Sequence, residues 1–134
     1  MRSGTLNVPG IVGMGAAAAQ VGVCDPAARD ALEAVCVAHG GVVLGAGAPR
    51  LPNTLSVLFP FPGDLVTMAL DLEGFSVSTG SACSSGSATD SHVVAAMGLS
   101  GIPVRFSLGA NSDIGLLLQI LPTVLERMRG ACAL

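Results

Sequence analysis

The sequence contains no lysine, no tryptophan and no tyrosine, and charged residues fill only 11% of its 134 positions. The basic residues are all arginines and are scattered along the chain: Arg2, Arg29, Arg50, Arg105, Arg127 and Arg129. With no basic run and only 3% aromatic residues, the chain lacks the charged and stacking surface that a nucleic-acid partner needs. So little charge must also leave apolar residues at the surface, and such surface usually meets a partner.

A long apolar run is also missing. The longest, Ile11–Ala19, is far shorter than the roughly 20 residues that cross a bilayer, so no membrane span is expected. Pro9, Gly10 and Gly13 interrupt the apolar core that a secretion signal would require. We therefore expect a cytoplasmic protein.

The cysteines show no spacing typical of a zinc site or a CxxC motif; they are Cys24, Cys36, Cys83 and Cys132. Without a secretion signal they are predicted to be free thiols. Cys24, Cys36 and Cys132 are interpreted as small buried or incidental residues. Cys83 differs from them because of its neighbours.

Helical and strand patterns interleave along the chain, which predicts an α/β or α+β layer structure. Helices are expected over residues 8–20, 27–38, 64–73, 91–97 and 114–128, and strands over 42–44, 54–59, 75–78 and 103–108. Asp64 is expected to cap the third helix, and Pro122 to kink the last one. In the last strand, Val104, Phe106 and Leu108 should share one face, with Arg105 on the other.

Cys83 lies within a run of small, mostly polar residues, from position 78 to position 89. Such a segment cannot pack a core and moves at little cost, so a thiol within it would be accessible. This environment suits a nucleophile that attacks one bound group and passes its cargo to another. A surface Ser/Gly loop with an incidental cysteine explains the composition equally well.

Two further positions are candidate binding residues. Arg105, on the face opposite the apolar residues of its strand, could fork onto a carboxylate, although an ordinary solvated arginine is the simpler interpretation. Thr5 precedes a helix start, where hydroxyl and backbone N–H groups can hold a phosphate. That signal is weak by itself, because short Ser/Thr/Gly stretches are common at helix starts.

Five segments occur together in a recognisable order. They are residues 1–13, with Arg2-Ser3-Gly4-Thr5; residues 50–57, with Arg50-Leu51-Pro52-Asn53; the cysteine segment Ser78–Ser87; residues 91–99; and Val104-Arg105-Phe106-Ser107-Leu108-Gly109. This series resembles the last third of cysteine desulfurases of the nitrogen-fixation and iron–sulfur-cluster type. The resemblance implies one small carboxy-terminal domain of the fold-type I pyridoxal-phosphate transferase fold. Residues 1–24 would be an interface helix region, and 25–134 an α/β body with the active-cysteine loop at 78–89.

The resemblance also implies roles for single residues. Such enzymes use pyridoxal phosphate to take sulfur from L-cysteine, leaving alanine and an enzyme persulfide. Cys83 matches the persulfide-forming cysteine, Arg105 the arginine that binds the substrate carboxylate, and Thr5 a threonine that touches the cofactor phosphate across a homodimer. The sulfur would then pass to an iron–sulfur scaffold or another acceptor, and Cys83 could contact a cluster iron transiently.

The chain departs from this family in one decisive respect. A Schiff base to the cofactor requires a lysine amine, and there is no lysine. We therefore expect no desulfurase activity from the chain alone. Three interpretations stay open: a portion working with a lysine-bearing large domain, a non-enzymatic persulfide carrier or dimerisation partner of a full desulfurase, and an inactive remnant.

Overall fold

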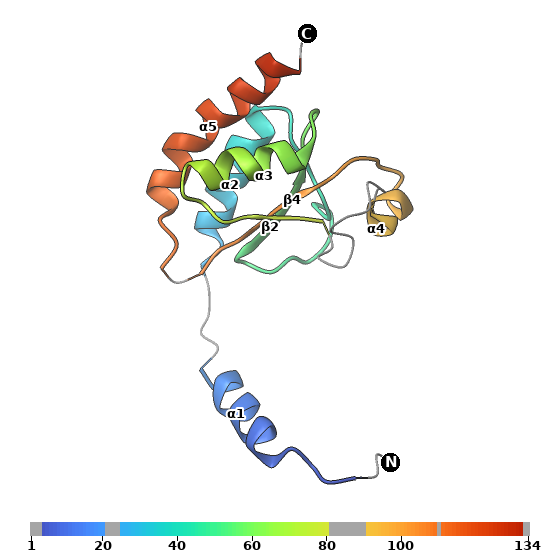
Figure 1. Cartoon of the computed structure of the whole chain (residues 1–134), viewed down its shortest axis with the longest axis vertical. Helices are drawn as coiled ribbons and strands as arrows, with labels where there is room; N and C mark the ends of the chain where they lie inside the picture. Colours follow the sequence, from blue (N-terminus) through green and yellow to red (C-terminus); the bar gives the residue numbers. More distant parts are fainter. Residues whose placement is uncertain (1–3, 21–24, 81–90, 110, 133–134) are drawn as a thin grey trace.

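The structure, a computed structural model, describes residues 4–20, 25–80, 91–109 and 111–132. Helices and strands interleave along the chain, as the sequence predicts. In order they are α1 (Val8–Ala18), α2 (Ala27–Ala38), β1 (Val42–Val43), β2 (Thr54–Leu58), α3 (Gly63–Leu72), β3 (Ser78–Thr79), α4 (His92–Ala96), β4 (Val104–Ser107) and α5 (Ile114–Ala131) (Figure 1).

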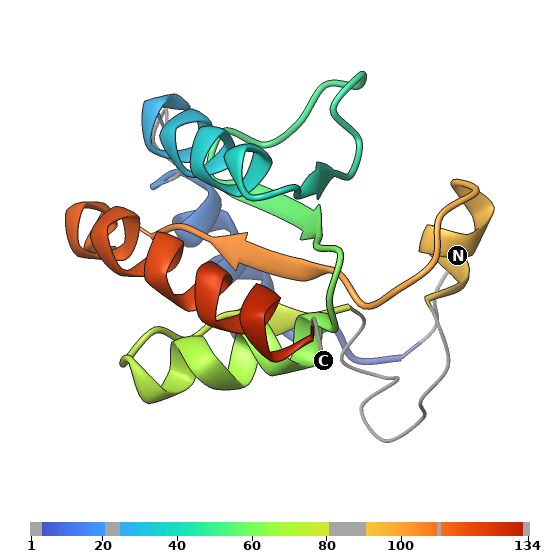
Figure 2. The same ribbon diagram turned by 90° about the horizontal axis from the view of Figure 1, so that it is seen from above.

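The strands form one antiparallel sheet in the order β1-β2-β4-β3. Three helices pack on one face of it, with α5 lying between α2 and α3 (Figure 2). Because side chains alternate along a strand, half of each strand points into this layer and half points away from it. The body is thus a two-layer α/β structure with one open sheet face.

The core lies between the sheet and the three helices. From β2 and β4 it receives Leu55, Val57, Val104 and Phe106, which are at most 1% exposed. The helices contribute Leu32, Cys36, Val66, Leu70, Leu117, Leu121, Val124 and Leu125. Full burial of one such aliphatic or aromatic side chain contributes roughly 1.5–3 kcal/mol, so this interface stabilises the body.

The helix cap expected at Asp64 is wrong, because the N-cap residue of α3 is Pro62. The helix begins at Gly63 after Pro62, and the Asp64 carboxylate accepts only the neighbouring Leu65 N–H, at 3.0 Å. Gly63 is packed against the Ile102 carbonyl oxygen, which would lie only 2.1 Å from an added Cβ. The absence of a side chain at Gly63 therefore allows this close approach of helix and loop.

The strand expected over residues 75–78 is also wrong, because β3 covers only Ser78 and Thr79. Residues before it close α3 instead: Gly74, at φ +86°, donates to the Asp71 carbonyl at 2.9 Å, and Phe75 donates to the Leu70 carbonyl at 2.9 Å. This pair of hydrogen bonds is a Schellman motif. The Phe75 ring, partly buried, packs against the core and supplies the apolar contact that often accompanies this motif.

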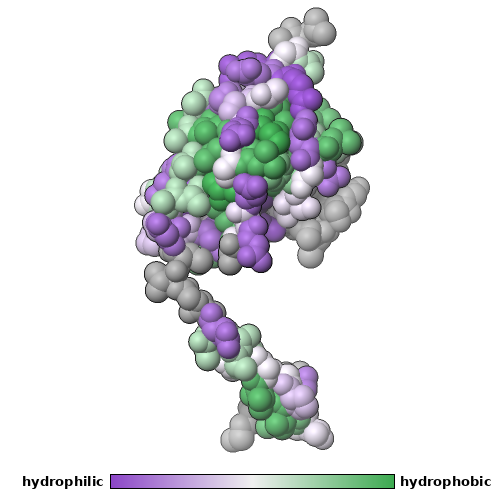
Figure 3. Space-filling view, turned by 90° about the vertical axis from the view of Figure 1, so that its left-hand side faces the viewer, coloured by the Kyte–Doolittle hydropathy of each residue, from purple (hydrophilic) through white to green (hydrophobic). Residues whose placement is uncertain are grey.

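The helix α1 stands apart from the body (Figure 1). Asn7 caps it by accepting the Gly10 N–H at 3.2 Å, and none of its residues is buried. Apolar residues are exposed on α1 and on the body alike (Figure 3), which confirms the apolar surface expected from the composition. Within the described ranges, no helix is both long and apolar enough to span a membrane.

Candidate functional site

Arg105 lies on the open face of the sheet. Its neighbours in β4, Val104 and Phe106, point into the core, whereas Arg105 and Ser107 are exposed, which confirms the predicted alternation. Ser56 of β2 and Ser78 of β3 lie directly opposite Arg105 on either side. A guanidinium between two small hydroxyl side chains is accessible to a ligand from above the sheet.

The end of β4 is attached to the start of β2 by Asn53. Its side-chain amide donates to the Leu108 carbonyl at 3.1 Å, and its own carbonyl accepts the Leu108 N–H at 2.8 Å. At the next residue, the Gly109 N–H donates to the Ser112 hydroxyl at 2.9 Å. Sequence reasoning gave Asn53 no role; an asparagine just before a strand was the available signal.

The segment that leads to Cys83 begins beside Arg105. Thr79 pairs with Val104 in the β3–β4 ladder, and the Gly80 N–H donates to the Pro103 carbonyl at 3.1 Å. Cys83 itself lies outside the described residues, as does most of the predicted loop 78–89. In the sequence, two residues separate it from Gly80.

Thr5 is not brought to this site within one copy of the chain. It is exposed in the segment before α1, which stands apart from the sheet (Figure 1). The Asn7 side chain already accepts the Gly10 N–H of the first turn. Its role at a cofactor phosphate stays a prediction.

The remaining described thiols lie elsewhere. Cys36 is buried in the core on α2, and burial, together with the nearby Glu33 charge, raises the pKa of its thiol to about 12. It is therefore neutral and unreactive near pH 7. Cys132 is exposed at the end of α5. The interpretation of a buried structural cysteine is confirmed for Cys36, and Cys24 lies outside the described residues.

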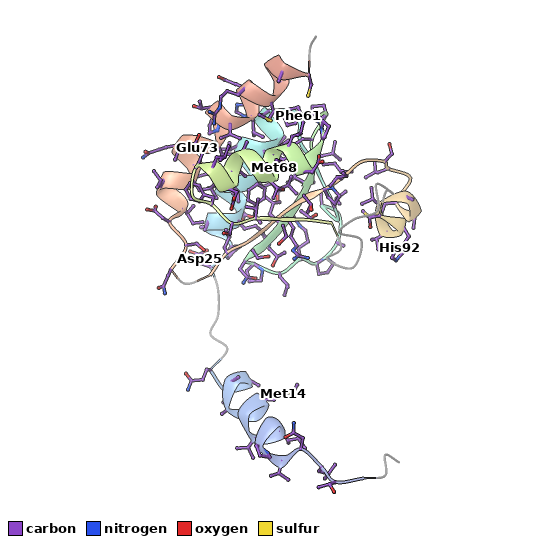
Figure 4. The ribbon with its side chains drawn as sticks, in the orientation of Figure 1. Met14, Asp25, Phe61, Met68, Glu73 and His92 are labelled. Atoms are coloured by element: carbon purple, nitrogen blue, oxygen red, sulfur yellow. The ribbon has the colours of Figure 1, made fainter. Side chains whose placement is uncertain are left out.

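In the described part of the chain, the two histidines and one pocket are the other candidates for a functional site. The His39 ring lies 2.9 Å from the Val35 carbonyl and 4.0 Å from Glu126, and His92 stands exposed on α4 (Figure 4). A pocket of about 480 Å³ lies between the turn Phe59–Pro62 and residues 100–102, and its lining includes no titratable side chain. No group of three potential metal ligands occurs in the described part of the chain. Cys83 lies outside that part of the chain, so its expected contact with a cluster iron stays a prediction.

Known proteins resemble this chain both in sequence and in structure. No family model matches the chain. A cysteine desulfurase of Cereibacter sphaeroides is 40% identical over 142 residues, which cover 96% of this chain and 37% of that protein. A cysteine desulfurase of Klebsiella pneumoniae is 35% identical over 144 residues, with 96% and 36% covered.

A solved structure of a NifS-like protein superimposes with a TM-score of 0.69 and 29% sequence identity. The match covers 94% of this chain and 35% of the NifS-like chain. This chain therefore spans little more than a third of the length of the relatives it matches.

Proposed function

This chain corresponds to the carboxy-terminal portion of the cysteine desulfurases, with the α/β fold of that part of fold-type I transferases, and on that premise we propose its role. It supplies the sulfur-accepting thiol, Cys83, and the carboxylate-binding group, Arg105. The observation that carries the proposal is the pairing of Ser78 with Arg105, because it starts the Cys83 segment beside the guanidinium.

Arg105 binds and orients the substrate. Its fixed fork of N–H donors matches the two oxygens of an α-carboxylate, and its exposed position on the open sheet face leaves that fork accessible. The Cys83 thiolate attacks the sulfur of L-cysteine. The new S–S bond forms as the substrate C–S bond breaks, and the electron pair stays on the carbon that takes a proton and becomes the alanine methyl group.

Pyridoxal phosphate, when bound, supplies the electron sink for this chemistry. The chain fits that cofactor only in part. The hydroxyl of Thr5, beside the start of α1, offers donors of the kind that hold a phosphate. Since there is no lysine, the covalent link must come from another polypeptide segment. In one copy α1 and the segment before it stand apart from the sheet (Figure 1), so a second copy or a full-length desulfurase would have to complete the site.

The sulfur held on Cys83 then passes to an acceptor, for which an iron–sulfur scaffold is the class that the family suggests. Any contact of Cys83 with a cluster iron belongs to that transfer step. The assembly is a homo- or hetero-oligomer, in which the exposed residues 4–18 form the contact region.

Reconstitution tests the proposal. The chain is mixed with a lysine-bearing large domain, pyridoxal phosphate and L-cysteine, and alanine is measured. Alanine should form only in the mixture, be lost with Cys83→Ala, fall sharply with Arg105→Gln and persist with Cys132→Ala. Sustained alanine formation by the chain alone would contradict the proposal, and persulfide uptake only from a complete desulfurase would indicate a carrier instead.

A further inference from the structure

The outward side of α3 carries an uncovered row of large apolar residues. Leu65, Met68 and Leu72, named here the α3 stripe, are 42%, 64% and 89% exposed. The opposite side of the helix buries Val66 and Leu70 in the core. Figure 4 shows Met68 on the side of α3 that faces the viewer. None of the three residues belongs to the core cluster.

The spacing of the stripe is that of a helix-packing surface. Positions i, i+3 and i+7 lie on one side of a helix, and seven residues advance about 10 Å along its axis. Apolar anchors at this spacing are typical of helices that pack against an amphipathic partner helix.

Acidic groups border the stripe along one edge. Asp64 and Asp71, also seven residues apart, are exposed, and each is three or four residues from Met68. Among the described residues neither carboxylate has an ion-pair partner, whereas the neighbouring Glu73 is paired with Arg127 at 2.6 Å. The complementary surface is thus an apolar ridge bordered by cations.

The described helices of this chain do not provide that ridge. The exposed helix α1 carries no charged residue. On α2 the exposed Val37 shares its helix with Asp30 and Glu33, and the one arginine of that helix, Arg29, is paired with Asp30 at 2.6 Å. The short helix α4 carries no arginine. On α5 the exposed Leu116 is near the start of the helix, and Arg127 and Arg129 are about three turns away. Charge complementarity therefore favours a different protein over a second copy.

We propose that the α3 stripe, with Asp64 and Asp71, binds a basic amphipathic helix of a partner protein. The inference is independent of the desulfurase chemistry, because α3 packs on the sheet face opposite to Arg105. Loss of one role would leave the other intact.

Fluorescence anisotropy of the whole chain with a labelled synthetic peptide tests this. The probe is a helical peptide with leucines at i, i+3 and i+7 bordered by lysines, and its control has glutamate in place of each lysine. The lysine peptide should bind about tenfold more tightly than the glutamate peptide, with a difference that shrinks at high salt. Equal affinity for the two peptides would overturn the proposal.

Variants of the stripe assign the binding surface. Met68→Ser/Leu72→Ser should weaken binding about tenfold, because both side chains are anchors, and circular dichroism should show unchanged helix content. Leu116→Ser, at a residue 44% exposed on α5, is the matched control and should bind normally. Equal loss in the two variants would overturn the proposal. So would self-association in the ultracentrifuge that Met68→Ser/Leu72→Ser abolishes, because it would assign the stripe to a second copy.

Discussion

Ser78 lies directly opposite Arg105 across the β3–β4 ladder. Two residues later, the Gly80 N–H donates to the carbonyl of Pro103, two residues before Arg105. This short ladder fixes where the Cys83 segment leaves the sheet. Arg105 and the residue after which the cysteine segment begins, Gly80, are thereby joined through one strand pair.

The Asn53 bridge between β2 and β4 should matter for stability. Asn53→Ala removes the donor to the Leu108 carbonyl and is expected to lower the free energy of unfolding by about 1–2 kcal/mol. Urea titration monitored by circular dichroism measures this, with the exposed Asn111 changed to alanine as the control. Equal midpoints for the two variants would show that the bridge contributes nothing.

The buried Cys36 thiol predicts a loss of stability at high pH. Burial raises its pKa in the folded chain from 9.0 to about 12, so above pH 9 only the unfolded chain releases this proton. The free energy of unfolding should therefore fall by about 1.4 kcal/mol per pH unit between pH 9 and pH 11. The chain has no lysine or tyrosine, so no other side chain type except cysteine titrates in that window.

Cys36→Ala is the comparison for that pH dependence. It should be less stable at pH 7 because it leaves a small cavity, but its stability should fall less steeply above pH 9, because the thiol whose pKa is raised by folding has been removed. Identical slopes for the two proteins would mean that the Cys36 thiol ionises as readily in the folded chain as in the unfolded one.

Two helix glycines should respond oppositely to alanine. Gly63→Ala places a Cβ 2.1 Å from the Ile102 carbonyl oxygen and should cost about 1–3 kcal/mol of unfolding free energy. At Gly130, inside α5, an added Cβ meets open space, so Gly130→Ala should be neutral or stabilise by up to about 1 kcal/mol. Thermal melting compares them, and a tolerated Gly63→Ala would refute the close contact.

Local signals in the sequence were sufficient for most helices. The bounds of α2 are those expected from Asp25-Pro26 and the glycines after His39, and Asp113 caps α5 by accepting the Leu116 N–H at 2.9 Å. The alternation in β4 also predicted the exposed side of Arg105. These features depend on residues close in sequence, which is why reading the chain could find them.

Features set by distant contacts could not be found in this way. Gly63 starts α3 because of Ile102, which is 39 positions away in sequence. Phe75 looks like a strand residue, but its N–H closes α3 and its ring joins the core. The pairing of Arg105 with Ser56 and Ser78 likewise depends on sheet order, which no local pattern encodes.

The most direct measurement is a mass map of the chain's cysteines after incubation with L-cysteine, pyridoxal phosphate and a lysine-bearing large domain whose own cysteines are replaced. We expect one added sulfur atom on the peptide that contains Cys83, and none on those with Cys36 or Cys132. Omission of the large domain should abolish it. Sulfur added to the exposed Cys132 but not to Cys83, or no addition in the complete mixture, would contradict the assignment of Cys83 as the acceptor.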